Sequence, residues 1–496
     1  MPEAPLRDLS LIPPKADPSL SNSALLPTQE RTWSWFDYLS FWMSDVHSVG
    51  TYVTLGNLFA GDLPGGAVVI GLLLGIFIVQ GFCNLIALPS QQTGTPFPVV
   101  CRASFGIKGA LIPAFVRGII AVCWYGIQTW LASNALLVLL LKCAPALTPW
   151  ADLSHHGFCG LSPLGWLCFL SLWLVQAAIF WRGLESIRHF TEWAGPLIYV
   201  VMLALDFYLL YRVGLSAGMQ AIAKSLVETG QTLSSHGFLA SILMTITLTV
   251  SYFSAPMLNF GDFARYAKTP EVFRRGNFWG LPANFLTFTA LTFTTIALTF
   301  PAFGIRLSDP VETVARTDNP TVIIIGILTF MLSTAGINVV VNFVSASFDF
   351  SNLAPEKISW RAAGFGAALL SVLITPWNLY NSPAAMHFTL DFLASLIGPF
   401  YGILIADFFF VRQRHISVPD LYSLSPQGRY WYTNGINHRA VFTLGVSTIL
   451  ANAGVLFPEL AEFSGLSWFI GCFSALLLYP MLNRKNIVSV STEQFR

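Results

Sequence analysis

The sequence predicts an all-α integral membrane protein with twelve membrane-spanning helices, and composition and apolar segments both support this prediction. Of the 496 residues, 54% are hydrophobic and only 10% are charged, whereas soluble domains contain about 25% charged residues. Apolar stretches of about 20 residues, the length that crosses the hydrocarbon core of a bilayer, occur twelve times along the chain. These observations exclude a soluble fold and make the lipid bilayer the expected environment.

The segments between the spans predict the orientation. Twenty Lys and Arg residues lie on the side of both termini, five lie on the other side, and Arg117 falls within the third span. Because basic residues mark cytoplasmic loops, both termini are expected in the cytoplasm of a multi-pass protein of the plasma (inner) membrane. In chain order, the predicted spans are residues 36–58, 67–88, 110–141, 161–181, 192–211, 238–260, 277–301, 319–348, 362–378, 387–411, 440–456 and 465–483.

The same pattern divides the chain into five parts. Residues 1–30 are polar, rich in proline and without a cleavable signal, so they are expected to form a cytoplasmic tail. Residues 31–411 contain spans 1–10, and a cytoplasmic loop at 412–439 follows. Spans 11 and 12 occupy 440–483, and a second cytoplasmic tail occupies 484–496.

Span 1 contains ionisable residues at its centre. Its sequence reads Ser44-Asp45-Val46-His47-Ser48, with Gly50 close behind. An ionisable group at this depth costs about 2.5–3.5 kcal/mol on insertion, and such groups usually face a cavity or a partner. The pattern favours an unwound helix lining a transport path; the alternative is that Asp45 and His47 pair structurally with each other or with a neighbouring helix.

Span 6 also contains residues typical of an interrupted helix, namely Ser251, Ser254, Pro256 and Asn259. An ordinary kink at Pro256 is the alternative. Two interrupted helices five spans apart indicate inverted repeats of spans 1–5 and 6–10 with a binding site between them. Spans 11 and 12 would then be additions to this core.

Spans 3 and 8 supply candidate ligand contacts. Trp124 and Gln128 are four residues apart in span 3, as are Asn338 and Asn342 in span 8, so each pair shares a helix face. An indole can stack on a planar ring, and an amide can bond to a cyclic amide edge. The alternatives are a core tryptophan and hydrogen bonds between helices. We select Asn342 as the span 8 contact.

Other function classes find little support. The seven cysteines show no metal-binding spacing, and no paired catalytic carboxylates or activated nucleophile are recognisable. We therefore expect no enzymatic activity, no metal site and no cofactor. The net charge of +1 gives no indication of a nucleic-acid partner. A substrate-gated channel or a sensor is the rival class, and it would not accumulate its ligand against a gradient.

Several segments resemble one transporter family. They are RTWSWFDYLSFW (31–42), RASFGIKGALIPAFVRG (102–118), WYGIQTW (124–130), GINVVVN (336–342), ITPWNLY (374–380), IADFFFVRQRHISVPDLYS (405–423) and YWYTNGINHRA (430–440). Together they are similar to the nucleobase–cation symport family of purine, pyrimidine, allantoin and hydantoin permeases, in its bacterial type. The resemblance implies a LeuT-like fold, with a 5+5 inverted repeat plus two extra helices, and alternating access.

The resemblance also assigns the substrate contacts. It implies that Trp124 stacks on the substrate ring and that Gln128 and Asn342 bond to its amide groups. Ser48 stands where the hydantoin transporters have a glutamine, which disfavours hydantoin itself. Tyr252 and Phe253 stand where those transporters have Gly-Trp, so the second wall of the pocket is altered.

The cation site departs further from the family pattern. Sodium-coupled relatives use two span 1 carbonyls, here those of Ser44 and His47, and complete the site from helix 8. On helix 8 those relatives use one carbonyl and Ser/Thr hydroxyls, and the matching positions here are Ser333, Gly336 and Ile337. Gly336 and Ile337 have no hydroxyl group, so both hydroxyls of the family site are missing. This favours coupling to a proton; an alignment shift of three residues would restore a sodium site.

Taken together, the sequence predicts a monomeric secondary transporter that imports a small planar nitrogen heterocycle by symport. Uracil or a related pyrimidine is the expected substrate, with Asp45 and His47 as the expected proton carriers. The alternative is a sodium-coupled importer of allantoin, hydantoin or a purine.

Overall fold

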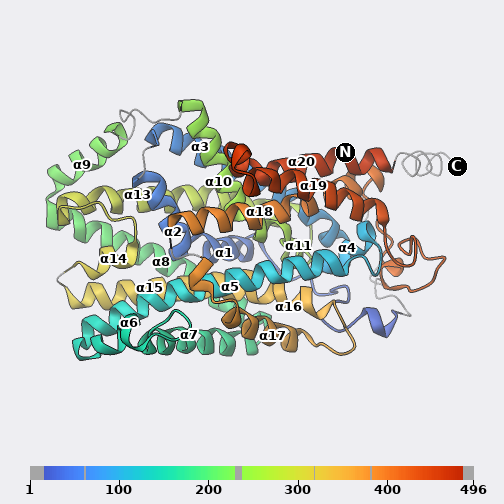
Figure 1. Ribbon diagram of the computed structural model, residues 1–496, viewed down its shortest axis with the longest axis horizontal. Coiled ribbons are helices and arrows are strands. Elements are labelled where there is room, and N and C mark those ends of the chain that lie inside the picture. Colours follow the sequence, from blue (N-terminus) through green and yellow to red (C-terminus); the bar gives the residue numbers. More distant parts are fainter. Residues whose placement is uncertain (1–15, 61–62, 229–236, 318, 380–381, 484–496) are drawn as a thin grey trace.

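The computed structural model describes residues 16–60, 63–228, 237–317, 319–379 and 382–483 (Figure 1). The first 15 residues of the predicted N-terminal tail and the whole predicted C-terminal tail, 484–496, lie outside the described residues. Within the described ranges the chain is helical, and its β-structure is limited to three isolated bridges.

The helices of spans 1–5 follow the predicted order, with span 1 divided into two halves. They are α1 (Trp35–Val46), α2 (Val49–Ala60), α3 (Gly65–Thr93), α5 (Leu111–Cys143), α7 (Pro163–Trp181) and α8 (Leu184–Val213). Shorter helices connect them or follow them: α4 (Phe97–Phe105), α6 (Leu153–His156) and α9 (Leu215–Glu228).

Spans 6–10 repeat this arrangement, and three of them contain π-helical segments. They are α10 (Phe238–Leu258), α12 (Pro270–Phe278) with η3 (Trp279–Ala283) and α13 (Asn284–Phe303), α15 (Pro320–Ile337) with η4 (Asn338–Phe343) and α16 (Val344–Ser351), α17 (Trp360–Leu373), and α18 (Pro383–Ile405) with η6 (Ala406–Val411). The remaining helices include α11 (Gly261–Ala264), α14 (Pro310–Ala315), α19 (His438–Leu456) and α20 (Ser467–Leu482).

The described helices account for the twelve predicted spans. Ten are long and apolar enough to cross a membrane, and α17 is a shorter apolar helix. The divided span 1, formed by α1 and α2, supplies the twelfth. In Figure 1, α5 crosses the middle of the molecule, α9 lies at one end and α4 toward the other, and α19 and α20 pack beside α18.

The predicted interruption of span 1 is confirmed. The N–H of His47 donates to Met43 O at 3.0 Å and ends α1, and α2 begins two residues later. The Ser48 hydroxyl then accepts from the N–H of Thr51 at 3.1 Å. This bond caps the first turn of α2, so Ser48 stabilises the restart of the helix.

The predicted interruption of span 6 at Ser251, Ser254 and Pro256 is wrong, because α10 remains helical through these residues to Leu258. The chain turns only at Asn259, before α11. The Ser254 hydroxyl bonds to Ser251 O at 2.7 Å within the helix. The polar residues are thus accommodated by bonds along the helix, a common arrangement for serine in membrane helices.

The described part of the predicted N-terminal tail packs against the folded protein at the α4 end. Arg102 Nη2 donates to Leu20 O at 2.8 Å, and Tyr422 Oη donates to Leu25 O at 2.6 Å. The side chain of Leu25 is fully buried. This segment therefore packs on the surface of the folded protein, with only Leu25 and Pro27 buried.

A buried ion pair joins several segments at the same end. Arg412 Nε lies 2.5 Å from Asp407 Oδ2, and both side chains are buried. Ser104 donates to the same oxygen at 2.8 Å, and Tyr479 donates to Asp407 Oδ1 at 2.9 Å. One carboxylate therefore holds together α4, the end of span 10 and α20.

Asp407→Asn is expected to destabilise the protein strongly. Breaking one side of a buried ion pair costs about 3–5 kcal/mol, because the other charge stays buried. Arg316→Gln, in the exposed pair of Arg316 with Glu312, is the control and should cost about 0–1 kcal/mol. The thermal denaturation midpoint of each purified variant in detergent measures its loss of stability. Equal midpoints for the two variants would contradict the stabilising role of the Asp407–Arg412 pair.

Candidate functional site

A buried cavity lies beside the break in span 1. Its cavity volume is about 20 Å³, room for a single water molecule, so a heterocycle can enter only if the walls move apart. Its walls come from α1, α5, α10, α15 and η4, and thus from both repeats. The lining residues are Asp45, Trp124, Gln128, Tyr252, Ala255, Pro256, Ile337, Val341 and Asn342.

Two aromatic rings form adjoining walls of this cavity. The Trp124 side chain from α5 is 8% exposed, and its ring centroid lies 6.0 Å from that of Tyr252, at an interplanar angle of 71°. The two rings are therefore nearly perpendicular, the edge-to-face arrangement that aromatic pairs favour. Trp124 therefore faces the protein interior, as predicted.

A chain of amides fixes the orientation of Asn342. Asn338 Nδ2 lies 2.7 Å from Gln176 Oε1, 2.8 Å from Thr129 Oγ1 and 3.0 Å from Tyr125 O. These acceptors turn Asn338 Oδ1 toward Asn342, whose Nδ2 donates to it at 3.0 Å. The carbonyl oxygen of Asn342 consequently remains for the cavity. The π-helical winding of η4, a feature often found at functional sites, carries both asparagines.

Two further acceptor oxygens in the cavity lining have no hydrogen-bond partner. They are Gln128 Oε1 and Asp45 Oδ2, both buried. A buried acceptor without a donor costs about 1–3 kcal/mol. Together with the carbonyl of Asn342, these atoms give the cavity lining acceptor oxygens that would complement the N–H groups of a ligand.

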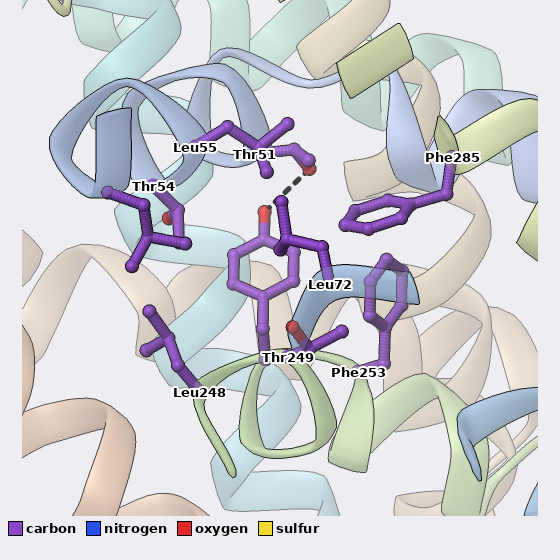
Figure 2. Close-up of a pocket in the computed structure, with 10 residues that line it drawn as sticks. Thr51, Thr54, Leu55, Leu72, Leu248, Thr249, Phe253 and Phe285 are labelled. Carbon is purple, nitrogen blue, oxygen red and sulfur yellow. Dashed lines mark hydrogen bonds between the residues drawn. The ribbon is translucent and has the colours of Figure 1, made fainter. Parts of the chain in front are cut away.

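Tyr252 separates this cavity from a second pocket toward the α9 end. Its hydroxyl lies 3.0 Å from Thr51 Oγ1 and 3.3 Å from Ser48 Oγ. Tyr252 lines both spaces, and Figure 2 shows Thr51, Leu72, Phe253 and Phe285 around the second. Phe253 packs edge-to-face on Phe285 at 5.6 Å. The structure therefore places Phe253 in the second pocket and Ser48 behind the Tyr252 hydroxyl, while Tyr252 reaches the main cavity.

The predicted proton carriers Asp45 and His47 do not contact each other through any hydrogen bond within the described residues. The ring of His47 turns away from the cavity, with Nε2 at 2.9 Å from Asn284 Oδ1 and Nδ1 at 3.2 Å from Gly195 O. It also stacks on Phe288 at 5.0 Å. Of the two residues, only Asp45 lines the cavity.

The helix 8 positions of the predicted cation site lie against span 1. A Cβ added at Gly336 would lie 3.6 Å from Ser44 Cβ. The Ser44 and Ser333 hydroxyls bond within their own helices, to Ser40 O at 3.2 Å and Phe330 O at 3.0 Å. The Thr334 hydroxyl lies 3.4 Å from the N–H of Val49. Ser44 thus faces Gly336, which has no side-chain oxygen.

Two residues that position the cavity were not selected as contacts from the sequence. Asn338 orients Asn342. The only sequence signal for this role was that the two asparagines are four residues apart and so share a helix face. Gly50 lets α2 approach α5 closely, because an added Cβ would lie 3.0 Å from Gln128 Nε2 and 3.2 Å from Tyr252 Oη. No local pattern in the sequence distinguishes this glycine from one that faces lipid.

The comparisons with known proteins agree with this architecture. The family model described as "Permease for cytosine/purines, uracil, thiamine, allantoin" matches residues 25–471. The allantoin permease of Bacillus subtilis is 33% identical over 468 residues, covering 94% of this chain and 93% of the relative. The purine-uracil permease of Arabidopsis thaliana is 32% identical over 444 residues, with coverage of 89% and 72%.

Among solved structures, a nucleobase-cation-symport-1 family transporter in a closed conformation with bromovinylhydantoin bound superposes with a TM-score of 0.74. It is 22% identical, and the match covers 95% of this chain and 97% of that one. A sodium-coupled sialic acid symporter matches with a TM-score of 0.63 at 13% identity, covering 91% and 90%. These likenesses establish the twelve-helix, LeuT-like inverted-repeat fold.

Fold and site together define a multi-pass membrane transporter, and the matched proteins are permeases rather than enzymes. The chain belongs to the nucleobase–cation symport family of permeases for cytosine, purines, uracil, thiamine and allantoin.

Gly50→Ala is expected to disturb the cavity while leaving the fold intact. The added methyl group would displace the Gln128 amide and the Tyr252 hydroxyl, which both line the cavity, so ligand affinity should fall. Gly81→Ala is the control, since nothing lies within 4 Å of an added Cβ there. Thermal stabilisation by a panel of nucleobases and ureides measures binding; equal stabilisation of both variants would contradict the close approach at Gly50.

Proposed function

We propose that the protein imports a small planar heterocycle rich in N–H groups, by alternating access and in symport with a proton. The observation that carries this proposal is a cavity among buried side chains with an indole wall, two acceptor oxygens on Gln128 and Asn342, and the carboxyl group of Asp45. Its position between the two repeats, beside the break in span 1, is typical of substrate sites in this class of transporter.

The acceptor oxygens favour a ureide such as allantoin over uracil. Uracil offers two N–H groups, whereas allantoin offers N–H groups on both its hydantoin ring and its ureido arm. The relatives support both ligands, since one is named an allantoin permease and another a purine-uracil permease. We therefore place allantoin first and uracil second, which reverses the order expected from the sequence alone.

The surroundings of Ser44 and Asp45 support proton coupling. A sodium ion requires several oxygen ligands, and Gly336 offers no side-chain oxygen beside Ser44. Asp45 is buried in the cavity wall, with one carboxylate oxygen lacking a partner. Protonation of this oxygen would neutralise the charge when the cavity closes. His47 is the second candidate carrier, held outside the cavity by Gly195 and Asn284.

The remaining features of the proposal come from charge distribution and the fold. The excess of basic residues on the side of both termini favours cytoplasmic termini and an inner-membrane location. The site lies within one chain, which supports a transporter that works as a monomer.

Trp124→Ala is expected to reduce allantoin affinity by about fivefold to a hundredfold, the usual value of stacking one heterocyclic ring on an aromatic side chain. Trp124→Phe should retain part of the stacking and hence intermediate uptake. Uptake of radiolabelled allantoin and uracil, normalised to protein in the membrane, measures this effect. Normal uptake by the alanine variant would contradict the stacking assignment.

Asn342→Ala is expected to change the ranking of competitors, because it removes an acceptor worth about 0.5–1.5 kcal/mol per hydrogen bond. Allantoin should weaken more than uracil. Asn378→Ala, an exposed asparagine outside the cavity, is the control. An unchanged competitor ranking in the Asn342 variant would remove it from the site.

The coupling ion and the class of protein can be tested in the same assay. Uptake is measured with sodium removed, and separately with the proton gradient collapsed by a protonophore. Proton symport predicts that the protonophore abolishes accumulation and that removal of sodium does not. Dependence on sodium alone would establish the sodium-coupled alternative, and no accumulation in any condition would favour a channel or a sensor.

A further inference from the structure

A fully buried glutamine lies outside the cavity, on α7. The side chain of Gln176 is 0% exposed, and the described cavity lining includes no residue of α7. Its Oε1 accepts from Asn338 Nδ2 at 2.7 Å and lies 3.3 Å from the Thr129 hydroxyl. Polar groups inside a membrane protein are costly to bury and often have a functional reason. The proposed function leaves this one without a role.

Three acceptors fix the orientation of the Asn338 amide. The carbonyl oxygen of Tyr125 can only accept, and it lies 3.0 Å from Asn338 Nδ2. The Thr129 hydroxyl donates to the same carbonyl at 2.8 Å, so its oxygen is left to accept from Asn338 Nδ2, also at 2.8 Å. An amide nitrogen has two hydrogens, and Gln176, the nearest of the three acceptors, receives one of them.

This orientation passes through the next asparagine to the cavity. Because Asn338 Nδ2 faces α5 and α7, its Oδ1 faces Asn342, whose Nδ2 donates to it at 3.0 Å. The Asn342 amide therefore keeps its oxygen on the side of the cavity that it lines. If the Asn338 amide were reversed, its Nδ2 would bond to Asn342 Oδ1, and Asn342 would present an N–H group to the ligand instead.

The group at position 176 decides how easily this reversal occurs. With Gln176 Oε1 toward Asn338, the reversed arrangement would bring two acceptor oxygens together without a donor between them, which is costly for buried groups. Gln176 Nε2 is buried and has no hydrogen-bond partner among the described residues. A rotation of the Gln176 amide would therefore break no bond of Nε2 and would offer this donor to a reversed Asn338. The polarity of the cavity wall thus depends on a residue that does not touch the ligand.

We propose that Gln176 is a positioning residue that determines specificity, because it holds Asn342 with its carbonyl oxygen toward the ligand. The relay of three amides, Gln176, Asn338 and Asn342, runs from span 4 through span 8 to the cavity. It makes the Asn342 wall of the site an acceptor and so favours a ligand edge that carries an N–H group. This inference rests on the proposed binding site, and it concerns the choice among ligands rather than the coupling ion.

Uracil and cytosine are the probes for this polarity. Both rings have the same size, but uracil carries a ring N–H beside a carbonyl where cytosine carries an unprotonated ring nitrogen beside an amino group. Isothermal titration calorimetry of the purified protein measures the dissociation constant of each ligand. Gln176→Met, which removes the acceptor from a side chain of similar length, should lower the preference for uracil over cytosine by about twofold to tenfold, the value of one hydrogen bond.

Three variants separate positioning of the ligand site from a general loss of stability. Gln176→Glu keeps an acceptor oxygen and should retain the wild-type ratio of dissociation constants. Gln91→Met removes a buried glutamine of α3 that lies outside the cavity lining, and it should leave the ratio unchanged. In the Asn342→Ala background, Gln176→Met should have no further effect on the ratio, because its influence passes through Asn342.

Thr129 decides the outcome if Gln176→Met does not fold. Thr129→Val removes a second acceptor of Asn338 Nδ2, whereas Thr129→Ser keeps the hydroxyl, so only the valine variant should lower the ratio. Equal ratios for these two variants overturn the proposal. An unchanged ratio in Gln176→Met, or a change that persists in the Asn342→Ala background, also overturns it.

The binding result can be separated from the transport assay. A wild type that accumulates no heterocycle, but whose ratio still responds to Gln176, would refute the proposed import and leave the relay standing. A wild type that binds neither uracil nor cytosine would refute the relay together with the proposed site.

Discussion

The break in span 1 at His47 and Ser48 is the feature on which the rest of the site depends. It ends α1 just after Asp45, so that a carboxylate enters the cavity wall, and it restarts the helix so that Gly50 contacts Gln128. The same short segment brings Ser48 and Thr51 to the Tyr252 hydroxyl. In a continuous helix the backbone N–H and C=O groups would bond to one another, and the side chains would keep the regular spacing of 3.6 residues per turn.

Polar residues that support this break come from far apart in the chain. Asn338 collects acceptors from α5 and α7 and in turn orients Asn342. Asn284, on span 7, contacts His47 and accepts from Tyr199 Oη at 2.6 Å. In the low-dielectric interior such networks are rigid when each member is satisfied. Two atoms left without partners, Asp45 Oδ2 and Gln128 Oε1, lie in the cavity lining where the ligand is proposed to bind.

Much of the fold could be predicted from the sequence, because apolar length and loop charge report directly on membrane spans. The break in span 1 was also predictable, since an acid, an imidazole and a glycine lie together in one apolar segment. The position of the turn in span 6, at Asn259, was harder to predict, because serine and proline can be accommodated within a membrane helix. Trp124, Gln128 and Asn342 meet in the cavity as expected. Phe253, one residue after Tyr252, points to the adjacent pocket because successive side chains of a helix face different directions.

The central claim is that a heterocycle lies flat on Trp124 and fills the acceptor-lined cavity beside the break in span 1. Cryo-electron microscopy of the protein with allantoin at saturating concentration tests it most directly. We expect ligand density parallel to the Trp124 indole, with N–H groups within hydrogen-bond distance of Gln128 Oε1 and Asn342 Oδ1. Ligand density confined to the pocket beyond Tyr252, or an empty cavity at a concentration that saturates uptake, would contradict the account.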